Sequence, residues 1–350
     1  MPVPDISRRS LIARAAAVSA AAAVFGVPTI VRAAGPKEKV PVAVGSEHAL
    51  VYLPWDLAKA LGYFDQEGLD VQITYTKGGS EAATALASGS VEYSGNAIDH
   101  AIAAAERGKS LVMIADFMNQ PGIALVVRPG DREKFKSFAD FKGKTLGVTS
   151  IGSATHVLAV WMGHRAGLGK DDVKIVGVGG GSTMISAISG NQVDGAFGND
   201  PYVTTLIKTG RGAQWAGLYT AAETRRALGF GSYCFTGALT RAEVIQKNPE
   251  RTQKIVNALV RAQKYMATHT SAQIAAALPD EFRGGTPTGD WATAYSHSRP
   301  AYTPHGEIAL DGVRAVIETN GYFLGQPAKV EPAKLFDNTF VDKAARGVRV

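Results

Sequence analysis

Three predicted strands run into glycine followed by serine and then a predicted helix, a pairing that suits the binding of an anion or another polar group. These glycine-serine corners are Gly78-Gly79-Ser80, Gly152-Ser153 and Gly179-Gly180-Gly181-Ser182. Glycine lets the backbone turn sharply and lets a ligand approach with no Cβ in the way. A serine at the start of a helix leaves backbone N–H donors and the positive end of the helix dipole facing outward. Each instance alone also fits a tight loop and a helix cap, and we expect Ser80, Ser153 and Ser182 to cap their helices.

Each corner joins a segment with strand periodicity to one with helix periodicity. The strands are predicted over residues 71–75, 145–149 and 173–178, and the helices that follow over 81–88, 154–166 and 183–189. In open α/β sheets, ligands bind beyond the carboxyl ends of the strands. The recurrence of the corners at strand ends therefore favours a ligand site over three unrelated loops.

Strands and helices alternate through most of the chain, which indicates an open α/β sheet with right-handed crossovers. The chain has 350 residues, 45% hydrophobic and 19% charged, which is enough for two lobes with separate cores. We predict that each lobe is an open α/β sheet. Residues 34–128 form the first part of lobe 1, 129–231 form lobe 2, and 232–350 return to lobe 1 with a helical tail.

Residues 1–33 have the features of a cleavable signal peptide of the twin-arginine type. Arg8-Arg9 precedes Leu11-Ile12, an alanine-rich run follows, and Val31-Arg32-Ala33 ends in a small residue suited to cleavage. A membrane anchor is the alternative, but Pro28 and Arg32 interrupt the apolar stretch before it reaches the ~20 residues that a spanning helix needs. The sequence predicts export to the periplasm as a soluble protein, by the twin-arginine or the general route.

Charge and cysteine content exclude several other classes of protein. Removal of residues 1–33 takes away four arginines and one aspartate, which lowers the formal net charge from +6 to +3. No basic run of five residues follows, so we expect no nucleic-acid partner. Cys234 is the single cysteine, so no internal disulfide and no lipid-anchoring cysteine near the cleavage site is expected. We predict no metal and no cofactor.

Several longer motifs occur one after another along the chain. They are Gly62-Tyr63-Phe64 with Glu67-Gly68-Leu69-Asp70-Val71, then Gly78-Gly79, Ala85–Gly89, Phe138–Lys144, Ala187–Gly195 and Asn199-Asp200-Pro201. Their order over residues 40–340 resembles the periplasmic solute-binding proteins of ABC importers, in the group that binds sulfonates, taurine, nitrate and thiamine-pyrimidine precursors. The resemblance implies a type II periplasmic-binding-protein fold with two crossing strands. It also implies hinge closure on a small molecule, and a monomer that docks on an inner-membrane permease with its ATPase.

The candidate ligand-binding residues follow predicted strand ends in both lobes. Lobe 1 supplies Ser46, His48, Tyr52, Gly79, Ser80 and Asn96, and lobe 2 supplies Ser153, Thr155, Gly181, Ser182 and Asp200. Each has another interpretation: His48 as an exposed loop residue, Tyr52 as a packing residue, Asn96 as a turn residue. At Asp200 many relatives carry Glu-Pro, so this chain departs from the family pattern there.

The ligand is expected to be a small organic anion, such as a sulfonate or a taurine-like compound. No arginine lies in the strand-end loops and Lys77 is the nearby cation, so amides and hydroxyls would hold the anion. The alternative is a pyrimidine-like thiamine precursor or another aromatic compound, contacted by aromatic side chains and the Asp200 carboxylate; the aromatic candidates are Tyr52, Phe117 and Tyr233.

Two other classes of protein compete with a transport role. An enzyme is one, because His48, His100 and His156 lie near the predicted cleft and some fungal relatives make the thiamine pyrimidine. The chain has no HExxH, no Gly-x-Ser-x-Gly and no Walker loop, so we expect that it is not an enzyme. A sensor domain of a regulator or kinase is the other, disfavoured by the export signal and by the lack of a helix-turn-helix.

Overall fold

The computed structural model describes residues 36–347. From Lys37 onward the described chain forms one compact unit. The predicted signal peptide, with its paired arginines and its cleavage site, lies outside the described residues.

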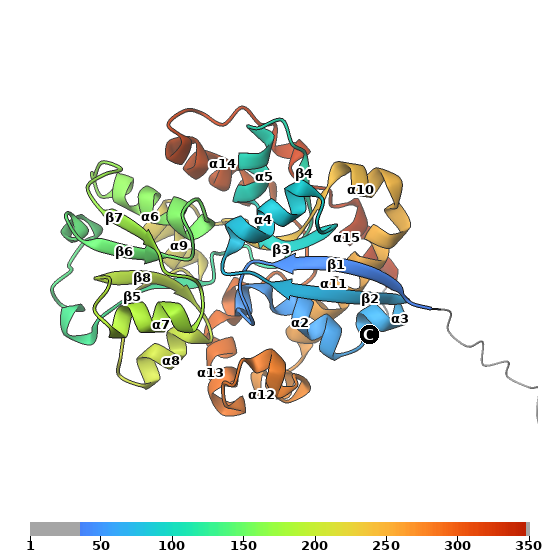
Figure 1. Ribbon diagram of the computed structural model, residues 1–350, viewed down its shortest axis with the longest axis horizontal. Coiled ribbons are helices and arrows are strands. Elements are labelled where there is room, and N and C mark those ends of the chain that lie inside the picture. The colour runs from blue at the N-terminus through green and yellow to red at the C-terminus, as the bar shows by residue number, and fades with distance from the viewer. Residues whose placement is uncertain (1–35, 348–350) are drawn as a thin grey trace, which may run out of the picture. The chain divides into compact units, whose positions relative to one another are not determined.

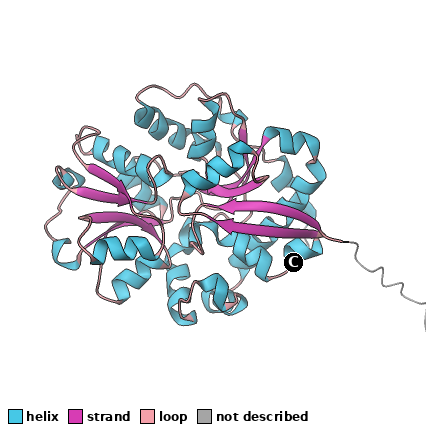
Figure 2. Cartoon of the chain, in the orientation of Figure 1, coloured by secondary structure: helices cyan, strands magenta, loops and turns pink. Residues whose placement is uncertain are grey.

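The first sheet has five strands in the order β2-β1-β3-β10-β4 (Figure 1). Their bounds are β1 (Glu38–Val44), β2 (Leu69–Tyr75), β3 (Tyr93–Ala97), β4 (Leu111–Asp116) and β10 (Thr236–Arg241). β1 pairs in parallel with β2 and β3, whereas β10 is antiparallel to β3 and β4. Every residue of β3 is buried, as expected for a central strand with helices on both faces (Figure 2). β4 is the outer strand but is also buried throughout, and the tail segment at Phe336 forms a bridge with its Met113.

The second sheet repeats this arrangement in the order β7-β6-β8-β5-β9. Its strands are β5 (Ile123–Val127), β6 (Thr145–Val148), β7 (Lys174–Gly177), β8 (Gly195–Asn199) and β9 (Ala213–Gly217). β6 is parallel to β7 and β8, and β5 is antiparallel to β8 and β9. The predicted fold class, α/β with an open sheet in each of two lobes, is confirmed. The connections predicted as crossing strands are short segments that lie between strands.

We refer to the first sheet and its helices as lobe 1 and to the second as lobe 2. Lobe 1 contains α2 (Leu53–Ala60), α3 (Tyr63–Gln66), α4 (Gly79–Ser88), α5 (Asp99–Ala105), α10 (Ala242–Lys247), α11 (Pro249–Thr268) and α15 (Thr339–Gly347). Lobe 2 contains α6 (Ala154–Arg165), α7 (Ser182–Ser189), α8 (Tyr202–Lys208) and α9 (Ala221–Leu228). The tail helices α12 (Ser271–Ala277), α13 (Thr288–Ser298) and α14 (Leu310–Leu324) lie beside both lobes, with α13 packed on α8 and α14 on α5 and α6.

The chain crosses between the lobes in two short segments, residues 117–122 and 229–235. The sequence-based boundary between residues 128 and 129 is wrong for strand Ile123–Val127. This strand pairs along its length with β8 and β9 and so belongs to lobe 2. The apolar run at residues 123–127 indicates a buried strand. Only the strands with which it forms hydrogen bonds show to which sheet it belongs.

Helix α11 shows how local sequence sets an element and its packing. It begins with Pro249 at its first position, and the Asn248 side chain accepts a hydrogen bond from the Arg251 amide. Ile255, Leu259 and Met266 follow at helical spacing and are all buried. The amphipathic pattern therefore directs one face of α11 to the core of lobe 1.

A substitution at Gly237 in β10 should destabilise the fold. A Cβ at this position would collide with the backbone oxygen of Ala115 and lie 2.9 Å from Met113 Cε, both on β4. We expect Gly237→Ala to lower the free energy of unfolding by about 1–3 kcal/mol, the range found for overpacked cores. Gly130→Ala is the control, because nothing lies within 4 Å of its Cβ position. Equal urea midpoints for the two variants would contradict the expectation.

Candidate functional site

A small cavity lies between the two lobes, where strands of both sheets end. It encloses about 30 Å³, room for about one water molecule. Predicted residues that line it are Ser46, Tyr52, Gly79, Asn96, Ser153 and Thr155. The other lining residues are Gly45, Val51, Ala97, His100, Ile123, Thr149, Ala154, Asn199 and Phe235. Two of the three predicted glycine-serine corners therefore meet at one cavity.

On the lobe 1 side, the start of α4 packs closely against β3 and α5. Asn96 Nδ2 donates a hydrogen bond to the Gly79 carbonyl at 2.9 Å, and its Oδ1 accepts one from the Ala97 amide at 2.9 Å. A Cβ at Gly79 would lie 2.8 Å from both Asn96 Oδ1 and His100 Nε2. Glycine is therefore required at the first residue of α4 by this close approach.

On the lobe 2 side, three hydroxyls form a connected group. Thr155 Oγ1 accepts a hydrogen bond from the Thr149 amide at 3.0 Å and lies 2.9 Å from Ser153 Oγ. The Thr149 and Thr155 hydroxyls are 3.1 Å apart. Ser153 and Thr155 are both buried. This group presents adjustable O–H donors at the start of α6.

The prediction that the three serines cap their helices is wrong. α4 begins at Gly79 with Gly78 as its N-cap, and α7 begins at Ser182 with Gly181 as its N-cap. Ser153 does occupy the N-cap position of α6, but its side chain makes no capping hydrogen bond. Its hydroxyl is engaged with Thr155 instead.

The third corner approaches the cavity without lining it. A Cβ at Gly180 would lie 2.6 Å from Ser46 Oγ of the other lobe, so the two backbones come close here. A Cβ at Gly181 would lie 3.5 Å from the ring of Tyr202. Ser182 is exposed. Gly181 and Ser182 were predicted ligand residues, and neither lines the cavity.

Ser80 lies outside the cavity and bridges the lobes. Its hydroxyl donates to the Ile151 carbonyl at 3.2 Å and accepts a hydrogen bond from Ser150 Oγ at 3.1 Å. Two further contacts join the lobes nearby: the Leu50 amide donates to the Asp200 carbonyl at 2.8 Å, and Tyr202 Oη donates to the Glu47 carbonyl at 3.0 Å. The lobes are thus held together around the cavity by polar contacts.

His48 belongs to a separate polar cluster in lobe 1. Its Nδ1 lies 3.5 Å from Asp56 Oδ2, and Tyr75 Oη donates to Asp56 Oδ1 at 2.5 Å. The imidazole also contacts the rings of Tyr75 and Phe282, with centroids 4.7 and 6.0 Å away. Burial raises the pKa of the Asp56 carboxyl. His48 is engaged within this cluster and does not line the cavity.

The Asp200 carboxylate is fully buried and its oxygens already have partners. Oδ1 accepts hydrogen bonds from the Thr204 amide at 2.9 Å and the Thr204 hydroxyl at 2.7 Å. Oδ2 accepts one from Ser298 Oγ at 3.1 Å. Burial raises the pKa of this carboxyl. Asp200 does not line the cavity, and neither do Phe117 and Tyr233.

Sequence reasoning placed His100 near the cleft but not among the ligand-binding residues, and it did not select Asn199 or Phe235. His100 Nε2 and Asn199 Oδ1 are buried without a hydrogen-bond partner and belong to lining residues. Burial lowers the pKa of His100 to about 4, so its ring is neutral at pH 7. His100 comes three residues after the end of β3, and this position beyond a strand end could have indicated it.

The cavity is polar but carries no formal charge. None of the described residues that line it is Arg, Lys, Asp or Glu. The ten-residue helix α4 and the twelve-residue helix α6 begin at its walls. First-turn N–H groups have no acceptor within their helix, and the positive dipole end lies there. The arrangement therefore offers N–H and O–H donors to an oxyanion or a neutral polar group.

Within residues 36–347, no group of three or more His, Cys, Asp or Glu side chains is placed to hold a metal ion.

None of the described helices combines the length and the apolar character needed to cross a membrane.

Comparison with known proteins gives a family match over most of the lobed region. The family described as NMT1/THI5 like matches residues 46–272. A curated relative, 4-amino-5-hydroxymethyl-2-methylpyrimidine phosphate synthase of Saccharomyces cerevisiae, is 25% identical over 236 residues. The alignment covers 65% of this chain and 67% of the yeast protein.

Solved structures agree in fold. A protein from Bordetella bronchiseptica RB50 is 30% identical, with a TM-score of 0.82 over 89% of this chain and 98% of its own. The alkanesulfonate-binding protein of Xanthomonas axonopodis pv. citri, solved bound to MOPS, is 18% identical with a TM-score of 0.67 over 89% and 99%. At 18% identity, the likeness to the Xanthomonas protein shows the fold alone.

One expectation from the sequence needs correction. The prediction that the protein is not an enzyme is contradicted by the curated relatives, which are named as pyrimidine phosphate synthases at about 25% identity. The absence of familiar catalytic motifs was its basis, and such motifs do not transfer between families.

His100 should make stability depend on pH in acid. Its pKa is about 4 when folded and near 6.5 when exposed, so the unfolded chain takes up the proton first as the pH falls. We expect the free energy of unfolding to fall by about 2–3 kcal/mol more in wild type than in His100→Gln between pH 7 and pH 4.5. Urea unfolding at each pH measures it.

The exposed His305 provides the control for this experiment, as His305→Gln. The raised pKa of buried Asp99, about 6, acts in the opposite direction and is common to all three proteins. A wild-type profile parallel to that of His100→Gln would show that His100 does not titrate as stated.

Ser80 should favour contact between the lobes. Ser80→Ala removes two hydrogen bonds across the cleft, and we expect it to shift the equilibrium between closed and open lobes about fivefold toward open, equivalent to ~1 kcal/mol. Small-angle X-ray scattering would report a larger radius of gyration. Ser88→Ala, on the same helix but bonded only within lobe 1, is the control. A radius equal to that of the control would contradict the role of Ser80.

Proposed function

Because the chain belongs to the NMT1/THI5-like family, we propose that it is the extracytoplasmic substrate-binding component of an ABC import system. Its ligand is a small organic anion, such as a sulfonate or a taurine-like compound, held between the two lobes. The observation that carries the proposal is the cavity itself: helix starts and hydroxyls of both lobes converge on it, and no acidic side chain lines it. An anion is favoured where N–H donors converge and no carboxylate repels it.

Capture takes place by hinge closure. A cavity of about 30 Å³ is too small for a sulfonate, so the ligand enters while the lobes are further apart. The two crossing segments, residues 117–122 and 229–235, are the chain connections about which the lobes turn. A ligand that contacts both Asn96 and Thr155 stabilises the closed form, because only that form offers both contacts.

The partners and location follow from this role. The closed form docks as a monomer on an inner-membrane permease with its ATPase, and residues 1–33 direct export to the periplasm. The alkanesulfonate-binding protein of Xanthomonas supports the role through its fold.

A pyrimidine-like ligand is the second candidate. The curated relatives are named as synthases of a pyrimidine phosphate. In the cavity, His100 Nε2 and Asn199 Oδ1 lack partners and Phe235 provides an aromatic surface, a set that suits a heterocycle with ring N–H or N groups. These three residues take the place of the Asp200 carboxylate, which the sequence suggested as a contact for such a ligand, because the oxygens of Asp200 are already engaged.

A thermal-shift panel should separate the two ligands. The compounds are taurine, alkyl and aryl sulfonates, nitrate, aromatic carboxylates and pyrimidines, followed by calorimetry of any hit. At 100 times its dissociation constant a ligand adds ~2.7 kcal/mol of stability. We expect a sulfonate or carboxylate to bind, and Ser153→Ala to weaken it about tenfold through loss of one hydroxyl contact.

Ser182→Ala is the matched control, because this serine also starts a helix but is exposed outside the cavity. Binding of pyrimidines but no anion, with loss in His100→Gln, would replace the first candidate by the second. Mass spectrometry of each compound after incubation detects turnover, which would add a synthase activity to the role.

A further inference from the structure

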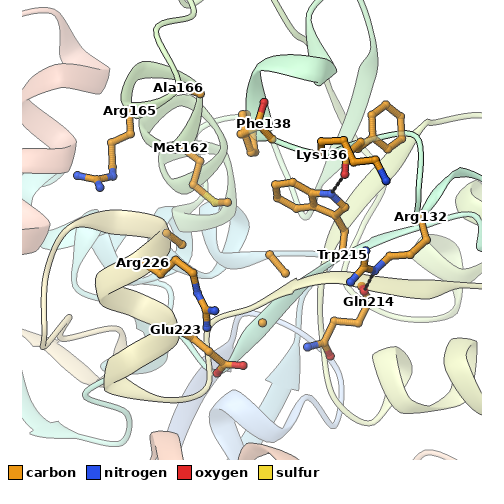
Figure 3. A pocket seen from close by; sticks show the side chains of 15 residues that line it. Arg132, Lys136, Phe138, Met162, Arg165, Ala166, Gln214, Trp215, Glu223 and Arg226 are labelled. Carbon is orange, nitrogen blue, oxygen red and sulfur yellow. Dashed lines mark hydrogen bonds between the residues drawn. The ribbon is translucent and has the colours of Figure 1, made fainter.

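Lobe 2 carries a groove of about 700 Å³ that shares no lining residue with the cavity between the lobes. Its walls are the segment 132–138, the end of α6, strand β9 and helix α9 (Figure 3). Arg226 and Glu223 project from α9 on one side, and Trp215, Arg132 and Lys136 lie on the other (Figure 3). This volume lies in the range of about 300–1,000 Å³ that small-molecule sites occupy.

A β-bulge places Trp215 in the groove. In the ladder between β5 and β9, Leu125 faces Ala216 and Val126 faces Gln214, so Trp215 is the extra residue. Bulges of this kind re-aim a side chain. The indole Nε1 donates to the Phe135 carbonyl at 2.8 Å, and the ring meets Phe141 edge to face with centroids 5.2 Å apart. The half-buried indole is therefore a fixed aromatic surface on the groove.

The charges around this surface are mostly positive. Four cations line the groove, Arg132, Lys136, Arg165 and Arg226, against one carboxylate, Glu223. Glu223 accepts hydrogen bonds from the Tyr219 and Thr220 amides, both at 3.0 Å. Its carboxylate is therefore already engaged by backbone donors at the start of α9. Among the described residues, Arg165 and Arg226 form no ion pair. On the opposite wall, Arg132 and Lys136 lie 3.5 and 3.3 Å from the exposed carboxylate of Glu133. The unpaired cations of the groove are therefore Arg165 and Arg226, beside an aromatic ring.

The free edge of β9 is poorly suited to pair with an extended peptide. β9 is the outer strand of its sheet, but the bulge at Trp215 interrupts its pattern of backbone groups. Arg132 Nε donates to the Gln214 carbonyl at 2.9 Å and so occupies one edge acceptor. Bulges and charged side chains of this kind protect edge strands from pairing. A compact ligand fits these features better than a peptide strand.

We propose that this groove is a second ligand site, one that takes a small aromatic anion such as an aryl carboxylate or aryl sulfonate. The aromatic ring lies against Trp215, and the anionic group is held by the guanidinium of Arg226 and by the cations of the opposite wall. The site is independent of the cleft, so its occupant can bind whether or not the cleft holds a ligand.

The test uses the fluorescence of the full chain. Trp215 is the half-buried one of the four tryptophans, because Trp55, Trp161 and Trp291 are 0%, 7% and 0% exposed. The probe is 4-nitrobenzoate, which quenches tryptophan emission, and 4-nitrobenzamide is its uncharged counterpart. We expect saturable quenching by the benzoate that is lost in Trp215→Phe, and at least about fivefold weaker binding in Arg226→Gln.

Arg225→Gln is the matched control, because it removes the same charge from the same helix at an exposed position outside the groove. We expect its affinity to stay within about twofold of wild type, and Ser153→Ala in the cleft to leave the quenching unchanged. Equal quenching by the benzamide, equal loss in the two arginine variants, or quenching that survives Trp215→Phe would each overturn the proposal. Loss of quenching in Ser153→Ala alone would assign the probe to the cleft.

Discussion

The two crossings of the chain between the sheets are the constraint on which the rest of the structure depends. After residues 117–122 the chain enters lobe 2 as β5, and after residues 229–235 it returns to lobe 1 as β10. Each of these strands is hydrogen-bonded on both sides, between β8 and β9 or between β3 and β4. Neither can shift without breaking two ladders of hydrogen bonds. Two short connections therefore join two well-paired sheets, an arrangement that is compatible with the hinge closure proposed above.

The same crossings bring strand ends of both sheets to one place. Asn96 and Ala97 end β3, Thr149 follows β6, and Asn199 ends β8, and all of them line one cavity. Helix α6, which follows β6, begins there, and so does α4, which follows β2. Because burial keeps His100 neutral, the cavity gains its polarity from dipoles and hydroxyls alone. Such fixed donors act without the cost of burying an unpaired charge.

The groove on lobe 2 has a different physical basis. Its arginines and lysine are exposed and hydrated, so each contributes a modest attraction, and the bulged Trp215 supplies the surface that is held in place. Under the proposed function the cavity would select by enclosure, whereas the groove would select by ring contact and net charge. Two sites of this kind on one chain need not compete, because they share no residue.

Periodicity and turn residues in the sequence determined the strands, the helices and the glycine-serine corners; the helix predicted over residues 81–88 lies within α4. They also identified Gly79, Asn96, Ser153 and Thr155 as residues at strand ends. The tertiary structure alone decided which side chains face the cavity. Asp200 is hydrogen-bonded to Ser298, which lies 98 residues further along the chain, and it does not line the cavity. His100 of α5 does line the cavity. Local patterns report the direction of the backbone, but the partner of a buried polar group comes from distant parts of the chain, and only the packed fold brings them together.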